Sequence, residues 1–289
     1  MLTLFTVAKV FQGEFALIQR NAIRSWRQLH PACEILLLGE EEGISEIAAE
    51  TGARQIKYLE RNESGTPLLS SIFAEAERHA KFPVVCYINA DILLLRDFLP
   101  AVRSILSWNQ RCLIVGRRWD MQITSEITAT QDWEKKLRAR METEASPHPH
   151  TGMDFFVFPK GLWGQLPPFA IGRGIWDGWL LYQAKEMGVP IVDATERLTA
   201  VHQNHSYAHH PEGAAGVWHG IEAQRNLALG GGVVHSYTLR DATHRLTGQG
   251  VRPRILPWDL RRSLVVPLVT RKWMRPLVQL KKTFLQQTY

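Results

Sequence analysis

Short apolar segments alternate with helical patterns over the first 116 residues, and this alternation constrains the fold more than any other feature. The apolar segments, each of which predicts a strand, are 2–7, 34–39, 54–59, 83–88 and 111–116. The helical patterns between them are 14–29, 44–52, 66–80 and a segment near 98–107. Strands that are apolar throughout are buried on both faces, which is typical of a parallel sheet covered by helices. We therefore predict an α/β fold with a mostly parallel central sheet.

The remaining segments complete this outline. Helical patterns are expected over 131–146 and 173–188, and a strand over 151–164. The pattern at 66–80 begins with Thr66 as the expected N-cap and Pro67 at the first helical position. The composition changes near residue 251, so we predict a main domain over 1–250 and an appendage over 251–289.

Basic charge is concentrated in that appendage. The chain has 34 Lys and Arg against 28 Asp and Glu, a formal net charge of +6. From Arg252 onward there are nine basic residues and one acid, which leaves 25 basic and 27 acidic residues before it. The body is nearly neutral, which argues against nucleic acid as a partner, because a nucleic-acid-binding domain carries its own basic face.

Targeting signals and cysteine usage indicate a cytoplasmic protein. The first residues, MLTLFTVAKVFQGEF, do not form a charged segment followed by a long apolar one, so no signal peptide is expected. No apolar stretch approaches the roughly 20 residues that span a bilayer. Cys33, Cys86 and Cys112 form no CxxC pair, and we interpret them as reduced and mostly buried thiols.

Asn89-Ala90-Asp91 interrupts the apolar run VVCYINADILLL and is the strongest candidate for a functional site. In α/β sheets, ligands bind beyond the carboxyl ends of the strands, which is where this triplet lies. Carboxylate and amide oxygens on a rigid turn suit Mg²⁺ or Mn²⁺ bound to phosphate. The alternative is a plain Asx-turn between two buried segments.

Several short motifs, in their order along the chain, resemble a bacterial family of GT-A glycosyltransferases that use nucleotide-diphosphosugars. They are FTVAKVF, QRNAIRSW, ERNESGTPLL, YINADILL, VGRRWD, TGMDFFVFPKGLWG, AIGRGIWDGWLL and VHQNHSYAHH. The likeness covers roughly residues 1–230 and leaves out the tail. It implies a GT-A-like fold, a nucleotide-sugar donor and a saccharide or lipid-linked acceptor. The triplet departs from the family's Asp-x-Asp pattern, since its first residue is asparagine.

The resemblance assigns the nucleotide to residues near the first strand and the third helix. Phe5, Thr6 and Lys9 lie at or after the first strand, where such enzymes hold the base and the ribose. Arg61 and Thr66 lie before a helix N-terminus, which favours anions through its free N–H groups. The alternatives are core packing for Phe5 and ordinary helix capping for Thr66.

The resemblance also implies a divalent metal, Mn²⁺ or Mg²⁺. Asp91 is the expected main ligand and Asn89 the second, although a neutral amide is a weaker ligand. The segment VHQNHSYAHH contains four histidines, and His202 is the one expected to join Asp91 because it ends an apolar stretch. A hydrogen-bonded or solvated role is the alternative for each histidine.

Sugar and acceptor contacts are expected from Arg117, Arg118, Asp154 and Trp176, and the catalytic role from Asp177. Arg117 and Arg118 follow a strand and place positive charge near a departing diphosphate or an anionic acceptor. Asp154 lies among apolar residues, where a carboxylate either grips sugar hydroxyls or anchors a turn. Asp177 lies at a helix start between Trp176 and Trp179, whose rings are expected to stack on sugar faces, and family members use such an acid as the general base in inverting transfer. The alternative is an acid that simply complements the helix dipole.

The tail interleaves apolar and basic residues and includes Trp258 and Trp273. Such segments suit an anionic membrane surface, so we expect peripheral attachment at the inner face of the membrane; packing back onto the domain is the alternative.

A glycosyltransferase is the function that the sequence favours, with the donor, the sugar, the acceptor and the stereochemistry left open. A sugar-nucleotidyltransferase is the first competitor, but it needs a glycine-rich loop after the first strand, and TVAKVFQGEF is poor in glycine. A non-catalytic nucleotide- or glycan-binding module is the second, and Asn89 is the feature that supports it.

Overall fold

The computed structural model describes residues 1–127, 132–206 and 213–254. By compactness the chain divides into Met1–Pro253 and Arg254–Tyr289. Strand β13 (Gly250–Pro253) crosses the boundary expected at residue 250, so the first unit extends to Pro253. The basic tail and two of the four histidines, His209 and His210, lie outside the described residues.

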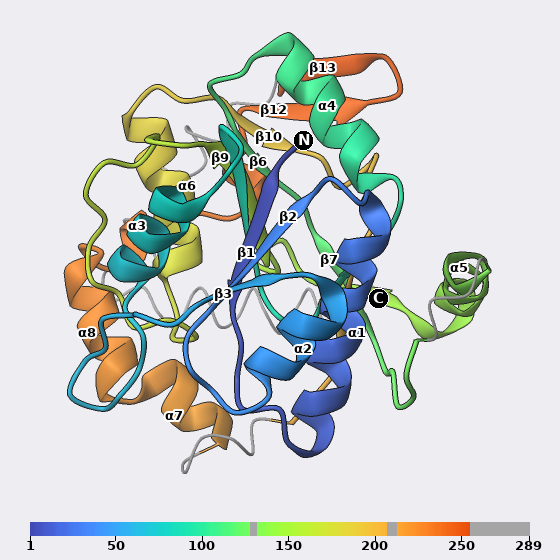
Figure 1. Ribbon diagram of the computed structural model, residues 1–289. Coiled ribbons are helices and arrows are strands. Elements are labelled where there is room, and N and C mark those ends of the chain that lie inside the picture. The colour runs from blue at the N-terminus through green and yellow to red at the C-terminus, as the bar shows by residue number, and fades with distance from the viewer. Residues whose placement is uncertain (128–131, 207–212, 255–289) are drawn as a thin grey trace, which may run out of the picture. The chain divides into compact units, whose positions relative to one another are not determined.

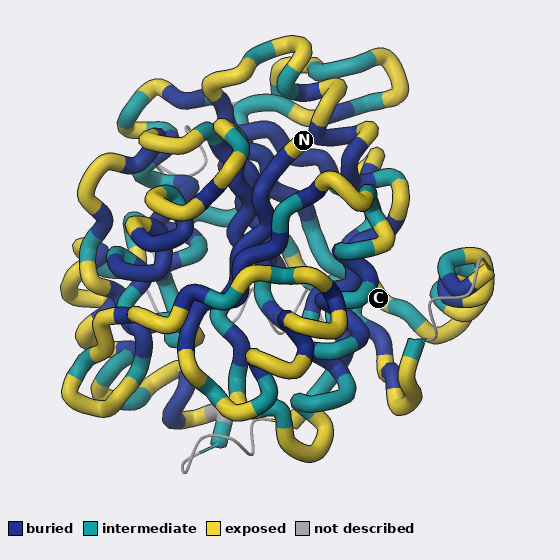
Figure 2. Tube along the Cα trace, viewed as in Figure 1, coloured by how far each residue is buried: buried dark blue, intermediate teal, exposed yellow. Residues whose placement is uncertain are grey.

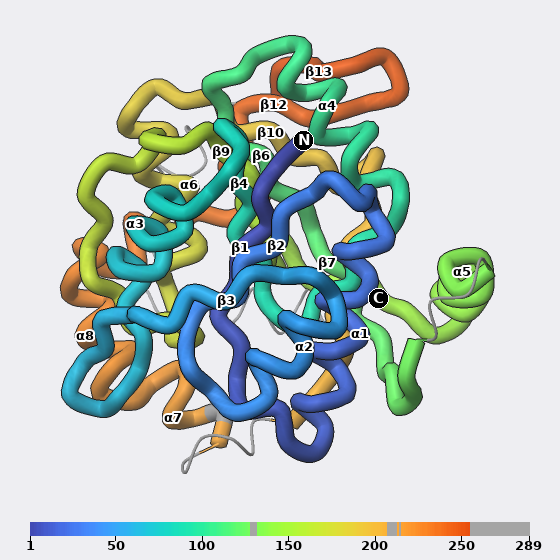
Figure 3. Tube along the Cα trace, in the orientation of Figure 1, coloured from blue at the N-terminus to red at the C-terminus, as the bar shows by residue number. Residues whose placement is uncertain are grey.

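A nine-stranded sheet forms the centre of the first unit, in the order β13-β12-β10-β6-β9-β4-β1-β2-β3. Its remaining strands are β1 (Thr3–Val7), β2 (Glu34–Leu38), β3 (Arg54–Ile56), β4 (Val84–Ile88), β6 (Leu113–Val115), β9 (Phe155–Pro159), β10 (Ile191–Asp193) and β12 (His244–Thr247). All neighbours are parallel except where β9 or β13 takes part. Figure 3 shows β4, β1 and β2 side by side. The predicted α/β class with a mostly parallel sheet is confirmed.

Side chains that alternate along the strands build a core on each face of this sheet. Leu4 and Cys86 belong to one core with helices α1 (Gly13–Leu29), α2 (Ile44–Thr51) and α4 (Phe98–Trp108), whereas Phe5 and Tyr87 belong to the other with α3 (Leu69–His79) and α6 (Trp176–Glu186). Figure 1 shows α3 and α6 on one side and α1 and α2 on the other. The central strands are buried along their length (Figure 2). The apolar strands therefore fix the sheet between two helical layers.

The other helical segments are α5 (Trp133–Glu144), α7 (Gly213–His219), α8 (Ile221–Leu229) and two short 3₁₀ turns, Val233–His235 and Leu239–Asp241. In the part of the chain that the structure describes, none of the helices has the length and apolar character needed to cross a bilayer. The three cysteines are buried and form no disulfide.

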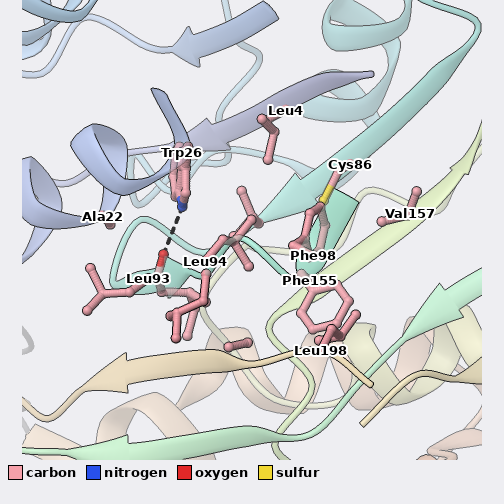
Figure 4. Close-up of a cluster of buried hydrophobic side chains, with 14 of the residues drawn as sticks. Leu4, Ala22, Trp26, Cys86, Leu93, Leu94, Phe98, Phe155, Val157 and Leu198 are labelled. Atoms are coloured by element: carbon pink, nitrogen blue, oxygen red, sulfur yellow. Dashed lines mark hydrogen bonds between the residues drawn. The ribbon is translucent and has the colours of Figure 1, made fainter. Parts of the chain in front are cut away.

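A second, four-stranded sheet has the order β5-β11-β7-β8. Its strands are β5 (Ile92–Leu94), β11 (Ala200–Gln203), β7 (Arg118–Met121) and β8 (Ser146–Pro147). Helix α1 contacts it directly, because the indole N–H of Trp26 donates to the carbonyl of Ile92 at 2.8 Å (Figure 4). This buried bond joins the helical layer to the strand that follows the Asn89-Ala90-Asp91 turn.

The expected start of the third helix was wrong. Helix α3 begins at Leu69, with Leu68 and not Thr66 at its N-cap position. Pro67 and Leu68 instead form isolated β-bridges with Arg61 and Ala170. A proline at N1 is compatible with a helix but does not exclude an extended segment, and the tertiary pairing decides between them.

Candidate functional site

A pocket of about 1160 Å³ lies at the carboxyl ends of β1 and β4 and is also lined from the four-stranded sheet. The predicted site residues that line it are Lys9, Thr66, Asn89, Asp91, Arg118, Asp154, Trp176, Asp177 and His202. Those that are not among its lining residues are Phe5, Thr6, Arg61 and Arg117. Residues from seven distant parts of the chain thus share one cavity.

Asp91, His202 and His205 form a cluster in this pocket, and their side chains are of the types that hold a metal ion. One ligand atom from each lies within 4.8 Å of the others. The Nε2 atoms of His205 and His202 lie 3.2 and 3.8 Å from Oδ2 of Asp91. His202 was expected here, whereas nothing in the sequence distinguished His205 from the other histidines of its segment.

Strand pairing brings these residues together. Asp91 directly precedes β5, and His202 on β11 pairs with Ile92 in antiparallel register. The N–H of Gln203 donates to the carbonyl of Asp91 at 3.1 Å, and its side-chain amide donates to the same oxygen at 3.2 Å. The backbone of Asp91 is therefore fixed from β11.

The carboxylate of Asp91 is charged and incompletely satisfied. Burial acts to raise its pKa, but the hydrogen bond with His205 and the charges of His202, His205 and Lys9 outweigh burial and hold the pKa well below its ordinary value. Its Oδ1 atom is buried and has no hydrogen-bond partner within residues 1–127, 132–206 and 213–254. A buried, ionised oxygen without a partner fits a cation ligand, because leaving it unpaired is costly.

Lys9 supplies a positive charge just beyond β1. Burial lowers the pKa of its ammonium to about 8, against the opposing charge of Asp91. Gln19 fixes the backbone on both sides, accepting from the N–H of Lys9 at 2.6 Å and donating to its carbonyl at 3.0 Å. The ammonium lies 4.2 Å from the ring centroid of Phe15, and this cation–π contact holds it at the pocket wall.

Asn89 takes part in a different network from Asp91. Its amide donates to Oδ1 of Asp154 at 2.7 Å, and its carbonyl accepts from the hydroxyl of Tyr87 at 2.9 Å. Arg118 donates to both oxygens of Asp154, at 3.1 and 3.0 Å. The expectation that Asn89 is the second metal ligand is therefore corrected, because both ends of its amide are engaged and His205 lies beside Asp91 instead.

Asp177 enters the pocket from the first turn of α6. Burial raises the pKa of its carboxyl to about 6, and the charge of Asp154 acts in the same direction. The N–H of Gly178 donates to its Oδ1 at 2.8 Å. Ile175, two residues before it, has a φ of 87°, a conformation that costs a β-branched residue roughly 1–3 kcal/mol. A carboxyl with a pKa near neutrality at a strained turn is suited to proton transfer.

Gly178 is required where it stands. A Cβ atom at this position would lie 2.6 Å from the carbonyl oxygen of Tyr237 and 2.6 Å from Oγ of Ser236. The N–H of Tyr237 donates to the carbonyl of Gly178 at 3.1 Å. The glycine thus lets the segment around Ser236 close against the start of α6, beside Asp177.

The structure corrects the expectation for Phe5 and Thr6. Phe5 is fully buried and packs edge-on against Phe73, Tyr87 and Phe158, with centroids 5.3, 5.6 and 6.3 Å away. Thr6 is also fully buried, and its hydroxyl contacts the carbonyl of Val7. Both side chains serve the core because they lie within β1, whereas Lys9 lies beyond its end.

Arg61, also expected at the nucleotide, is paired with Glu41 at 2.6 Å and donates to the carbonyl of Gly65 at 3.0 Å. Glu41 itself lines the pocket, and its Oε2 is buried with no hydrogen-bond partner in the described part of the chain. Thr66 lines the pocket, and its N–H donates to Oδ1 of Asn62 at 3.0 Å. On this side of the pocket, the side chain with an unpaired polar atom among the described residues is therefore that of Glu41, which the sequence did not single out. Arg61 is instead engaged by Glu41 and Gly65.

The pocket contains two indoles in different settings. Trp176 is 6% exposed and packs edge-on against Tyr87 at 5.3 Å, so most of its face is covered. Trp179 packs against Phe169 and is not among the lining residues. Trp218 lines the pocket and is 52% exposed. Its ring lies so close to Gly174 that a Cβ atom added to this glycine would be 3.3 Å from it. Trp218 is therefore the indole that offers an open face.

Arg117 lies outside the pocket, whereas Asp120 and His148, which the sequence did not indicate, lie beside Arg118. The N–H of Arg117 donates to Oγ1 of Thr195 at 2.8 Å, and the residue does not line the pocket. Asp120 and His148 were not expected, but they contact each other at 2.5 Å beside Arg118. Asp120 lies two residues after Arg118 on one strand, so the period of two was a usable signal for a shared face.

No family model matches the chain, and neither does any curated protein. Among solved structures, glucosyl-3-phosphoglycerate synthase from Mycobacterium tuberculosis in complex with Mg²⁺ and UDP is similar, with 17% identity, a TM-score of 0.49 and 80% of each chain covered. A mannosyltransferase from Pyrobaculum calidifontis in complex with GDP-Man and Mn²⁺ shows 15% identity and a TM-score of 0.44, over 69% of this chain and 56% of that one. At this degree of likeness, the function has to be argued from the site itself.

Proposed function

We propose that this chain is a metal-dependent glycosyltransferase of the GT-A type, which moves a sugar from a nucleoside diphosphate to a hydroxyl of a saccharide or lipid-linked acceptor. The observation that carries the proposal is the unpartnered Oδ1 of Asp91, within the described residues, beside two imidazole nitrogens and the ammonium of Lys9, in one pocket at strand ends. Such a site attracts a cation and the anionic phosphates that accompany it.

The residues present fit a divalent metal. Asp91, His202 and His205 would hold it, and two imidazoles with one carboxylate favour Mn²⁺ over Mg²⁺, which prefers oxygen ligands. When bound, the ion stabilises the negative charge that develops on a departing diphosphate. Lys9 binds the same diphosphate by direct charge.

The chain's own carboxylates divide the remaining tasks. Asp154 is held by Arg118 and Asn89, and so it presents a fixed acceptor to sugar hydroxyls. Asp177 takes the proton of the acceptor hydroxyl as that oxygen attacks the anomeric carbon, because its raised pKa allows it to accept a proton near neutrality. Glu41 accepts a hydrogen bond from the nucleoside through its Oε2, which has no partner among the described residues. A base at position 177 implies transfer with inversion.

A thermal-shift panel identifies the donor. UDP-, GDP-, CMP- and dTDP-sugars are tested with and without Mn²⁺, and one nucleotide class is expected to raise the melting temperature more with the ion than without it. A panel in which no nucleotide shifts the melting temperature, with or without Mn²⁺, would refute the proposal.

Hydrolysis of the selected donor then separates an enzyme from a binding module. Asp91→Ala and Asp177→Ala are expected to abolish most of the hydrolysis, whereas Glu144→Gln, an exposed acid on α5, is the matched control and stays at the wild-type rate. Unchanged rates in both site variants would exclude these two residues from the active site, and a wild-type chain without hydrolysis would leave the binding module as the better description. Proton NMR of the released sugar reports its anomeric configuration and tests the inversion.

For the tail beyond residue 251 we propose attachment to an anionic membrane surface, on the basis of its basic and apolar composition. Sedimentation with liposomes of anionic and of neutral lipid, with and without residues 252–289, tests this. Binding that requires both the tail and anionic lipid is expected, and equal binding without the tail would refute it.

A further inference from the structure

The two histidines of the cluster are each engaged at the ring nitrogen that faces away from Asp91. Nδ1 of His202 lies 3.2 Å from Oδ1 of Asp120, and Nδ1 of His205 lies 2.8 Å from the carbonyl oxygen of Ser206. A neutral imidazole carries its proton on one nitrogen and a lone pair on the other. In a neutral ring that binds a metal, an acceptor at Nδ1 therefore keeps the proton there and leaves the lone pair of Nε2 for the ion, in place of the contact that Nε2 of His205 makes with Asp91.

We infer that Asp120 is a positioning residue that orients His202 and increases the basicity of its Nε2 for the metal. The inference rests on the proposed function, since it presupposes that Asp91, His202 and His205 hold a divalent ion. Histidine ligands commonly donate their second N–H to a carboxylate, which fixes the ring and strengthens the ligand. Asp120 is not among the residues that line the pocket or form the cluster, and it acts through His202.

Strand register and side-chain contacts fix Asp120 in this place. Asp120 on β7 is the parallel partner of His202 on β11, so the two side chains share a face of the small sheet. Arg118 donates through Nε to Oδ1 of Asp120 at 2.9 Å, and Nδ1 of His148 lies 2.5 Å from Oδ2. Each oxygen therefore has a defined partner, and the carboxylate cannot turn away from His202 without losing both.

One other acceptor competes for the same nitrogen. Oδ1 of Asn204 lies 3.3 Å from Nδ1 of His202. An amide oxygen is neutral, whereas Asp120 is a carboxylate, and charge-assisted hydrogen bonds are roughly twice as strong as neutral ones. The charge of Asp120 should consequently matter more for metal affinity than the amide of Asn204.

The test measures Mn²⁺ binding to the full chain without nucleotide, by the loss of the free-ion electron paramagnetic resonance signal. Asp120→Asn, which keeps the shape and removes the charge, is expected to weaken Mn²⁺ binding by about 10- to 100-fold. Asn204→Ala, which removes the neutral acceptor at the same nitrogen, is the matched control and is expected to change affinity by less than about threefold. Asp120→Glu keeps the charge and is expected to retain more affinity than Asp120→Asn.

Melting temperatures of the metal-free variants show whether any loss of binding comes from unfolding. Wild-type affinity in Asp120→Asn, an equal loss in Asn204→Ala, or an equal loss in Asp120→Glu and Asp120→Asn would each overturn the inference while leaving the metal site in place. A wild-type chain that binds no Mn²⁺ would overturn the proposed metal site and this inference together.

Discussion

The nine-stranded and four-stranded sheets differ in what their strands present to their surroundings. In the central sheet, Leu4, Phe5 and Leu36 are fully buried and contribute apolar contacts to one face or the other. In the small sheet, Asp120 and His202 are half-buried and meet through charge and hydrogen bonds. The central sheet thus depends on apolar packing. The candidate site depends on polar side chains that the strand register of the small sheet brings together. Variants in the two sheets should consequently separate stability from ligand binding.

The largest separation is expected from Asp91→Ala. Removing the carboxylate eliminates the charge on which the metal and diphosphate depend, so the barrier to donor hydrolysis should rise by several kcal/mol and the rate should fall about a thousandfold or more. The melting temperature should fall only modestly, because the variant loses the contacts of Oδ2 with His205 and His202, whereas Oδ1 has no partner among the described residues to lose. Retained hydrolysis together with a large drop in the melting temperature would show that Asp91 stabilises the fold and does not take part in the reaction.

Asp177→Asn should separate catalysis from metal binding within the site. Loss of a general base lowers the rate by roughly 10²- to 10⁴-fold, while Mn²⁺ affinity stays at the wild-type value. The folded-state pKa of Asp177 is raised, so the charged form opposes folding once the pH exceeds the ordinary aspartate value. The melting temperature of Asp177→Asn should therefore exceed that of the wild type at pH 7, with a smaller difference at pH 4. A lower melting temperature of the variant than of the wild type at pH 7 would contradict the conclusion that the ionised form of Asp177 opposes folding.

Phe158→Ala is the corresponding change in the central sheet. Phe158 on β9 is fully buried, stacks on Phe73 at 5.4 Å and meets Trp163 at 5.4 Å. Truncating a buried phenylalanine costs about 3–5 kcal/mol in the free energy of unfolding. Urea unfolding measures this loss, and Mn²⁺ affinity of the folded fraction should be unchanged. A weakened Mn²⁺ affinity would show that the two sheets are coupled through the core.

Trp26→Phe tests the junction between the two regions. It leaves the buried carbonyl of Ile92 without its donor, which costs about 1–3 kcal/mol, and it loosens the strand that follows Asp91. We expect a modest loss of both stability and Mn²⁺ affinity. Trp133→Phe is the matched control, because the buried Nε1 of Trp133 has no partner in the described part of the chain. Equal effects in the two variants would mean that indole volume, and not the hydrogen bond, is responsible.

The smallest expected effect is the pH dependence of donor hydrolysis. Asp177 acts as a base only when it is ionised, and its pKa is about 6. The rate should therefore fall by about tenfold per pH unit below 6 and level off above it. The residual rate of Asp177→Asn should lack this inflection. A wild-type profile without it would assign the proton transfer to another group.

Much of the central sheet and its covering helices could be predicted from the local pattern of apolar residues. The strands at β1, β2 and β4 and the helices α1 and α2 followed from apolar runs and helical periods, because burial on both faces leaves a continuous apolar run in the sequence. The start of α3 could not be predicted, since the capping signal at Thr66 and Pro67 was overridden by a β-bridge to Arg61. That bridge depends on a contact outside the helix's own residues.

The site was predicted in part. Asp91 and His202 follow strand ends or apolar stretches, so their residue types and positions were enough to predict a cation site, and the structure brings the two side chains into one cluster. His205 was not chosen, because four histidines in one segment have no local mark that distinguishes a ligand from a solvated ring. Asn89 was assigned to the metal because it precedes Asp91, but its amide is engaged by Tyr87 and Asp154.

The sequence by itself determined the α/β class, the buried strands and the polar turn after β4, because these depend on the periodicity of neighbouring residues. Only the tertiary structure decided that Asp120 faces His202, that His205 joins Asp91, and that Phe5 is buried in the core. The reason is that a side chain's partner across a sheet is set by the register between strands distant in the chain, and a local pattern of residues does not encode that register.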